Sequence, residues 1–244
     1  MKLACALLFA AFAFVGTVSA IDFSQVQVSG KRITICRVNL RKDTLQLFSQ
    51  DDANQPIKRF DRLKELLEPR GQTLLFAMNG GMYHGDFSPV GLFVSDGKQL
   101  TPLNTSAGFG NFFLKPNGVF LVSETGAKVV ESSEYAQLHE RVILATQSGP
   151  LLVHAGRIHP SFIANSQSRL IRNGVGVVSP DIVVFAITED PVNLYEFASF
   201  FRDTLHCPNA LFLDGSVSSL YSEKLHRSDF RMDLGPIIAV TSSK

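Results

Sequence analysis

The segment that most constrains the fold is a short apolar run that ends in glycines, at residues 74–81. Leu74 to Met78 are apolar, and Asn79-Gly80-Gly81 follows them without a spacer. An apolar run this short, bounded at once by glycines, is typical of a buried strand. Glycine allows positive φ angles and lets another group approach the backbone closely. The segment therefore predicts a buried strand leading into a polar loop, which is either a tight structural turn or one wall of a site.

The same layout recurs twice further along the chain. One apolar run precedes Ser148-Gly149-Pro150, and another precedes Asp214-Gly215. Between these two loops, Arg172 is followed by Asn173-Gly174. A guanidinium therefore lies close in sequence to a glycine, which has no side chain to block a ligand. Together the loops offer a carboxylate, guanidinium groups, hydroxyls and backbone N–H groups. This set suits an anionic, oxygen-rich ligand such as a phosphate or a sugar phosphate.

Each of these residues also has a purely structural interpretation. Asp214 could accept hydrogen bonds from its own loop, as Asp before Gly often does. Arg172 could form an ion pair at the rim, and Asp86 could be an ordinary loop residue. Glu196 completes a capping box with Asn193, three residues earlier. The sequence leaves these alternatives open.

Several common catalytic motifs are missing from the sequence. Residues 215–219 do not match G-x-S-x-G, so no nucleophile elbow is expected. The chain contains neither G-x-G-x-x-G nor a phosphate-binding P-loop, and its six histidines lack a zinc spacing such as H-E-x-x-H. Oxygen-rich loops could hold a hard cation, but the sequence identifies no metal and no cofactor.

Residues 1–20 are expected to be a secretory signal peptide. Lys2 is followed by an apolar block from Leu3 to Val15, and Val18-Ser19-Ala20 ends the segment with small residues. The block is too short to favour a membrane span. We therefore expect cleavage after Ala20, export to the periplasm or the outside, and no integral membrane segment once the signal is removed.

Residues 21–244 are expected to form a single domain. Lys2 is one of 23 basic residues, so 22 basic residues face 22 acidic ones after cleavage. A neutral chain without a basic run gives no support for nucleic-acid binding. Cys36 and Cys207 could pair in an exported protein, or they could be two buried thiols.

Hydrophobic periodicity predicts few helices. The spacing of apolar residues indicates a helix near residues 57–67, a short helix over residues 134–141, and a third over residues 194–205 that begins at Asn193.

Short alternating and apolar runs predict many strands. Asp96-Gly97 is a strong hairpin signal, and Pro116-Asn117-Gly118 suggests a second hairpin that joins strands at 111–114 and 119–122. A longer strand is expected over residues 170–178. The expected fold is α+β, a single domain with a mixed, largely antiparallel sheet and a few packing helices.

The glycine-rich loops, taken in order, resemble the phosphodiester glycosidase family. That family carries Asn-Gly-Gly-Met/Phe-Phe/Tyr, then Ser-Gly-Pro, then an Arg-containing segment ending in glycines, then Leu-Asp-Gly-Gly-Gly-Ser-Ser. The matching segments are Asn79-Gly80-Gly81-Met82-Tyr83, Ser148-Gly149-Pro150, Arg172-Asn173-Gly174-Val175-Gly176 and Leu213-Asp214-Gly215-Ser216-Val217-Ser218-Ser219. The chain departs from the family pattern at Asn173, where Thr is usual, and at Ser216-Val217, where the family has glycines.

The resemblance implies an exported hydrolase that cleaves the glycosidic bond of a sugar-1-phosphodiester, in envelope or exopolysaccharide glycan metabolism. Asp214 is the candidate base or nucleophile, and Arg172 is the candidate phosphate ligand together with Arg169. The alternative is a non-catalytic envelope protein that binds a glycan or a phosphate-linked polymer through the same cleft. The further candidates for substrate contact are Asn79, Gly80, Gly81, Tyr83, Ser148, Gly149, Asn173, Gly215, Ser218 and Ser219.

Overall fold

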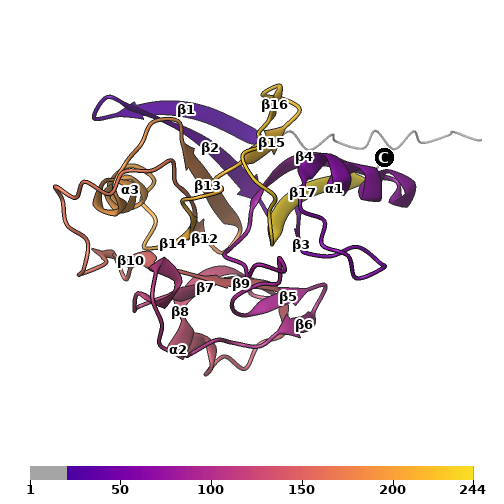
Figure 1. Ribbon diagram of the computed structural model, residues 1–244, viewed down its shortest axis with the longest axis horizontal. Coiled ribbons are helices and arrows are strands. Elements are labelled where there is room, and N and C mark those ends of the chain that lie inside the picture. The colour runs from indigo at the N-terminus through magenta and orange to yellow at the C-terminus, as the bar shows by residue number, and fades with distance from the viewer. Residues whose placement is uncertain (1–20, 244) are drawn as a thin grey trace, which may run out of the picture.

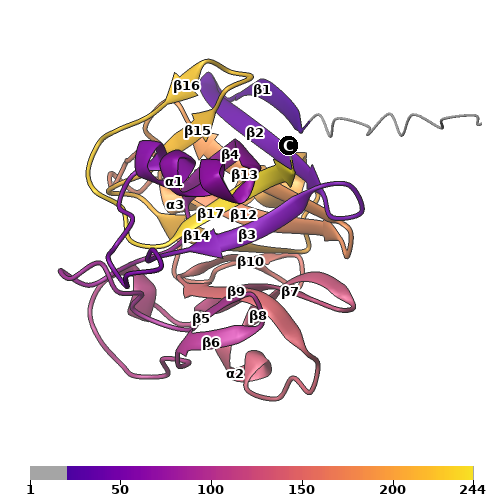
Figure 2. The same cartoon turned by 90° about the vertical axis from the view of Figure 1, so that its right-hand side faces the viewer.

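A computed structural model describes residues 21–243, so the predicted signal peptide at residues 1–20 lies outside the described residues. The strands form three antiparallel sheets, and the few helices are short (Figure 1). Figure 1 and Figure 2 both place the third sheet beneath the other two. The α+β class and the largely antiparallel pairing are thus confirmed, with the strands divided among three sheets.

The first sheet has seven strands and lies between two layers of apolar side chains. From β2 (Lys31–Asn39), Ile33 and Ile35 face the helix α3 (Leu194–Ser199), while Cys36 and Val38 face the other sheets. Because both faces are covered, β13 (Ile182–Thr188) is apolar from Ile182 to Ile187 instead of alternating. In spatial order the strands are β1 (Asp22–Val28), β2 (Lys31–Asn39), β13 (Ile182–Thr188), β12 (Asn173–Ser179), β14 (Asn209–Asp214), β10 (Leu151–His154) and β11 (Arg157–Ile158).

The second sheet contains the strand with which the sequence analysis began. The helix α1 (Phe60–Leu67) packs on it and ends in the 3-10 turn η1 (Glu68–Arg70), after which Gly71 takes a φ of 66°. The predicted strand and helix are both present. In spatial order the strands are β16 (Arg227–Ser228), β15 (Leu220–Ser222), β4 (Gln72–Asn79), β17 (Ile237–Ser243) and β3 (Thr44–Phe48).

In the third sheet, the hairpin predicted at Pro116-Asn117-Gly118 is not formed. Asn111–Phe113 forms a 3-10 turn, η2, and the strand that follows pairs across a turn at Gly126, whose φ is 111°. The expected turn at residues 116–118 is therefore wrong, because the glycine that reverses the chain lies eight residues later. The strands in order are β6 (Lys98–Thr101), β5 (Phe93–Ser95), β9 (Val142–Ser148), β7 (Gly118–Ser123) and β8 (Gly126–Glu131).

The helices differ from the sequence expectations mainly at their ends. The helix expected over residues 134–141 is a single turn, α2 (Ser132–Tyr135). The helix α3 (Leu194–Ser199) continues into a π-helical turn, η3 (Phe200–Thr204), and its capping box is formed as predicted. Among residues 21–243, no helix is long and apolar enough to cross a membrane.

The two cysteines of the described chain are free thiols. Cys36 is buried between the sheets, and Cys207 is buried in the separate cluster beneath α3. Of the two alternatives that the sequence left open, the structure therefore has buried thiols rather than a disulfide.

Candidate functional site

The predicted site residues lie where strands from all three sheets end. Asn79 is the last residue of β4, Ser148 the last of β9, and Asp214 the last of β14. Asn173 begins β12 and is opposite Asp214 in the strand register. The strand expected over residues 170–178 therefore starts three residues late, and Arg172 precedes it.

Asn79 and Asn173 join the first sheet to the second through a pair of buried amides. The Asn79 Nδ2 donates to the Asn173 Oδ1 at 3.1 Å, and the Asn173 Nδ2 donates to the Asn79 carbonyl at 3.1 Å. The backbone N–H of Ser219 donates to the Asn79 Oδ1 at 3.0 Å. Since buried amides are costly unless they are hydrogen-bonded, this arrangement fixes the end of β4 against the loop after β14.

The glycines of the first loop allow close packing of the backbone. A Cβ atom on Gly80 would lie 3.1 Å from the Ile238 nitrogen, and one on Gly81 would lie 2.9 Å from the Thr146 Oγ1. The Thr146 hydroxyl also donates to the Gly80 carbonyl at 2.8 Å. Gly80 and Gly81 thus hold the loop against β17 and β9.

Ser148 and Gly149 play a similar part in the second loop. The Ser148 hydroxyl donates to the Leu213 carbonyl at 3.0 Å, one residue before Asp214. A Cβ atom on Gly149 would lie 2.7 Å from the Asn117 Cβ. This loop therefore supports the strand that carries Asp214.

Asp214 is almost completely buried, with 8% of its surface exposed. Its Oδ1 accepts from the backbone N–H of Ser216 at 2.6 Å and of Val217 at 3.3 Å. Asp214 therefore accepts hydrogen bonds from its own loop, as the structural interpretation predicted. These two hydrogen bonds also fix the orientation of the carboxyl group. Burial raises the pKa of Asp214, against the effect of these N–H donors.

The charge of Asp214 affects the pKa of Tyr83. Burial raises the pKa of the Tyr83 phenol first, and the nearby charges of Asp214 and Asp233 raise it further. The Tyr83 hydroxyl donates to the Asp233 carbonyl at 2.6 Å. The first predicted loop and the Asp214 loop therefore approach each other.

Arg172 is 1% exposed and belongs to no ion pair among residues 21–243. Its Nε donates to the Val192 carbonyl at 2.8 Å and its Nη2 to the Ser168 carbonyl at 2.9 Å. Its Nη1 has no hydrogen-bond partner in the described chain. Burial lowers the pKa of Arg172 to about 10, so it is still a cation at neutral pH. A rim ion pair, the alternative from sequence, is thus not what the structure has.

Gly215 brings the guanidinium and the carboxylate loop together. A Cβ atom at Gly215 would lie 3.3 Å from the Arg172 Nη1. Any side chain at this position would crowd the guanidinium, which explains why the residue after Asp214 has none. The structure therefore places the Arg172 guanidinium directly beside the loop of the buried carboxyl group.

A small cavity of about 110 Å³ is lined in part by Arg172. Apart from Arg172, its lining residues were not predicted as site residues, and the one signal in the sequence is the polar run over residues 161–168. The cavity is lined by Leu114, Ser161, Phe162, Ile163, Ser166, Ser168, Arg172, Leu194 and Tyr195.

Ser218 and Ser219 form hydrogen bonds around the turn that follows Asp214, and the Ser218 hydroxyl also lies 3.3 Å from the Asn173 Oδ1. The Ser218 hydroxyl lies 3.1 Å from the Ile171 and Asp214 carbonyls, and the Ser219 hydroxyl donates to the Val217 carbonyl at 2.8 Å. These contacts fix the turn that follows Asp214.

Arg169 lies apart from this buried group. Its Nη1 and Nη2 bind the two carboxylate oxygens of Glu196 at 2.7 and 2.9 Å, on the surface. Arg169 is thus paired with the carboxylate of Glu196 in α3.

One group of side chains in the described chain has metal-ligand spacing, and it lies elsewhere. Glu131, Glu134 and His154 have ligand atoms within 4.8 Å of one another, at the end of β8, in α2 and on β10. Glu131 and Glu134 already form the capping box of α2.

The sequence profile of the phosphodiester glycosidase family matches residues 72–234, the part that carries all four loops. The chain belongs to the phosphodiester glycosidase family. It is similar to the uncharacterized protein YigE of Escherichia coli K12, with 33% identity over 184 residues, which cover 75% of this chain and 72% of YigE.

Two solved structures share the fold of this phosphodiester glycosidase family member. The zebrafish N-acetylglucosamine-1-phosphodiester alpha-N-acetylglucosaminidase catalytic domain, auto-inhibited by its pro-peptide, superposes with a TM-score of 0.61 at 15% identity, over 91% of this chain and 82% of that one. A putative exported protein from Burkholderia pseudomallei gives a TM-score of 0.58 at 11% identity, over 86% of this chain and 74% of that one.

Proposed function

We propose that the chain is an exported hydrolase that cleaves the glycosidic C–O bond of a sugar-1-phosphodiester. The observation that carries this proposal is the buried guanidinium of Arg172, whose Nη1 has no hydrogen-bond partner among residues 21–243 and lies beside the loop of Asp214. A phosphate is the natural counter-charge for such a group, because a guanidinium binds phosphate oxygens with directed N–H donors.

The reaction requires two groups from the protein, one that stabilises the departing anion and one that acts as a base or nucleophile. A phosphate diester is already a good leaving group, so the main requirement is to stabilise the departing anion and the oxocarbenium-like sugar. Arg172 would bind the anion. Asp214, held through its Oδ1, would act as the base that activates water or as the nucleophile, since both roles need an oriented carboxylate.

The known relatives support the substrate class and the compartment. The zebrafish relative is named for its action on an N-acetylglucosamine-1-phosphodiester. The Burkholderia relative is described as a putative exported protein, which agrees with the signal-like pattern of residues 1–20. We infer a phosphate-linked glycan of the envelope or of an exopolysaccharide as the natural substrate.

Turnover of a panel of sugar-1-phosphodiesters tests the proposal. Asp214→Asn is expected to lower turnover about 10³-fold or more. Arg172→Ala is expected to lower it about 10²- to 10³-fold, since it removes the group that stabilises the departing anion. Two surface changes, Asp96→Asn and Arg141→Ala, serve as matched controls and are expected to leave turnover unchanged.

The same panel separates the enzyme from a glycan-binding protein. If the wild-type chain binds a diester but turns over none of the panel, the hydrolase proposal is wrong and the non-catalytic alternative holds. Equal losses in the control variants would also contradict the assigned roles, because they would point to general destabilisation.

A further inference from the structure

A second and larger cavity, of about 350 Å³, opens between the β1–β2 hairpin and the segment of β15 and β16. Its lining includes Phe23, Gln25, Arg32, Glu189 and Arg227, and none of the site residues predicted from the sequence. A volume of this size falls within the range of small-molecule sites in proteins. The cavity therefore has room for a ligand of its own.

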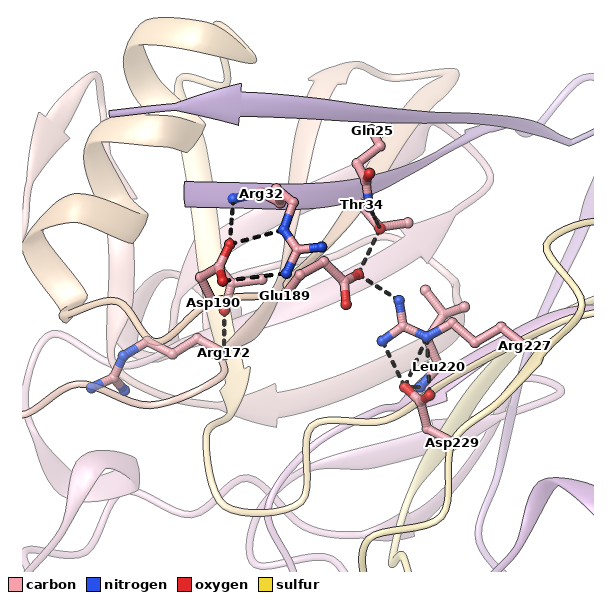
Figure 3. A network of polar contacts seen from close by, with 10 residues as sticks. Gln25, Arg32, Thr34, Arg172, Glu189, Asp190, Leu220, Arg227 and Asp229 are labelled. Carbon is pink, nitrogen blue, oxygen red and sulfur yellow. Dashed lines mark hydrogen bonds and ion pairs between the residues drawn. The ribbon is translucent and has the colours of Figure 1, made fainter. Parts of the chain in front are cut away.

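The charges around this cavity are paired with one another. Arg32 binds Asp190 through its backbone N–H at 2.9 Å and its Nε at 3.2 Å. Arg227 lies between Glu189 and Asp229 and binds both (Figure 3). Because each guanidinium already has a carboxylate partner, a charged ligand would have to compete with an ion pair. The electrostatics are thus opposite to those at Arg172 and favour a neutral ligand.

Several hydrogen-bonding atoms at the cavity are nevertheless free. The Glu189 Oε1 accepts from the Thr34 hydroxyl and from Arg227, while its Oε2 takes no hydrogen bond from the described residues. Arg32 uses its Nε and Nη2 for Asp190, which leaves its Nη1 unbonded within residues 21–243. In Figure 3 this third nitrogen points away from Asp190, toward Thr34. One acceptor and one donor on residues that line the cavity thus have no partner within residues 21–243.

Part of the lining is apolar. Phe23 and Leu225 contribute to the cavity, and the Phe23 ring is held by Phe76 at a centroid distance of 6.1 Å. An aromatic ring combined with planar amide, carboxylate and guanidinium groups is complementary to a pyranose, which has an apolar C–H face and neighbouring hydroxyls that both donate and accept.

We propose that this cavity binds one neutral pyranose unit, at a place separate from Arg172 and Asp214. The Glu189 Oε2 and the Arg32 Nη1 would bind neighbouring hydroxyls, Gln25 would bind a third, and Phe23 would lie against the C–H face. The site does not depend on hydrolysis, so it can exist whether or not the chain is an enzyme.

Saturation-transfer NMR and calorimetry with neutral methyl pyranosides (gluco, galacto, manno and N-acetylglucosamine) test this proposal. We expect the wild-type chain to bind at least one of them. Gln25→Trp should abolish that binding by filling the cavity without breaking an ion pair. Gln27→Trp is the matched control, since Gln27 is exposed on the same strand but does not line the cavity, and it should bind as the wild type does.

Two further variants fix the location. Arg32→Ala should weaken binding about fivefold, the usual effect of losing one hydrogen bond to a ligand. Arg172→Met should leave it unchanged, because the two sites share no residue. Binding of none of the pyranosides by the wild type overturns the proposal. So does binding that is lost in Arg172→Met or kept in Gln25→Trp.

Discussion

Arg172 shows how a single buried charge can indicate a missing partner. Burial lowers its pKa from 12.5 to about 10, which corresponds to a cost of about 3 kcal/mol at neutral pH. The Val192 and Ser168 carbonyls offset only part of this cost, since they satisfy two of its nitrogens and carry no full charge. An anion beside the Nη1 would supply what the protein lacks.

Inorganic phosphate should therefore stabilise the wild-type chain. At a hundredfold excess over its dissociation constant the gain is about 2.7 kcal/mol, which raises the Tm of a chain of this size by about 5–10 °C. Arg172→Met should lose this shift in a thermal melt, with sodium chloride of equal ionic strength as the control. An equal phosphate shift in both proteins would show that phosphate binds elsewhere.

Asp214 leads to a prediction about pH. Burial raises its pKa above 3.8, so the folded chain keeps this proton over a pH range in which the unfolded chain has lost it. The contribution of Asp214 to wild-type stability therefore falls as the pH rises from 3.8 through the folded pKa.

Asp214→Asn removes this titration and keeps an Oδ1 acceptor for Ser216 and Val217. The free energy of unfolding of the variant, relative to wild type, should thus be lowest at acid pH and rise toward neutral pH. Urea titrations across that range measure it. If the free energy of unfolding of the variant, relative to wild type, fell as the pH rises, an unrecognised partner would stabilise the charged form of Asp214.

At the scale of elements, the sequence predicted best where the signal is local. The strand before Asn79 and the capping box at Asn193 depend on neighbouring residues, and both are present. The hairpin expected at Pro116-Asn117-Gly118 failed because Gly118 begins a strand, while Gly126 makes the turn. The turn residues at 116–118 alone do not show which strands pair, and the pairing decides where the chain reverses.

The polar loop over residues 161–168 shows a second limit. Its serines line the cavity beside Arg172 because the Asn193 side chain, at the start of α3, donates to the Ala164 carbonyl at 2.9 Å and to the Ser166 carbonyl at 3.3 Å. Nothing periodic in the loop predicts that contact, which joins segments almost thirty residues apart in the chain.

Asn193→Ala should show what this connection contributes. It removes the N-cap of α3 and both contacts to the loop, so we expect a loss of about 1–2 kcal/mol of stability and faster amide exchange over residues 161–168. Asn165→Ala, an exposed position in the same loop, is the control and should change stability by less than about 0.5 kcal/mol. A loss of stability without faster exchange would mean that the loop is held by other contacts.

At the scale of the whole molecule, the two thiols lie in different layers, so their reactivity can show whether these layers open together. Cys36 lies between the sheets and Cys207 lies under α3, and burial raises the pKa of Cys207 to about 12. Neither thiol should react with a disulfide reagent at pH 8 unless the surrounding layer opens.

In a chain that begins at Ile21, we expect both thiols to be labelled only as fast as the whole fold opens, and therefore at one common rate. Peptide mass spectrometry after timed labelling in dilute guanidinium chloride measures the two rates separately. Faster labelling of Cys207 would show that the α3 layer opens by itself and would contradict a single cooperative unit.

The strand β17 has a consequence for how the chain is made. It lies between β3 and β4 in the second sheet, yet residues 237–243 follow every other strand of the fold in the sequence. During vectorial synthesis, β3 and β4 emerge early and have no shared neighbour until β17 arrives, so their edges stay open to wrong pairing. Because Asn79 ends β4, the candidate site is also among the last parts of the molecule to be completed. A newly made chain should therefore have an incomplete candidate site and be prone to aggregation until β17 has inserted.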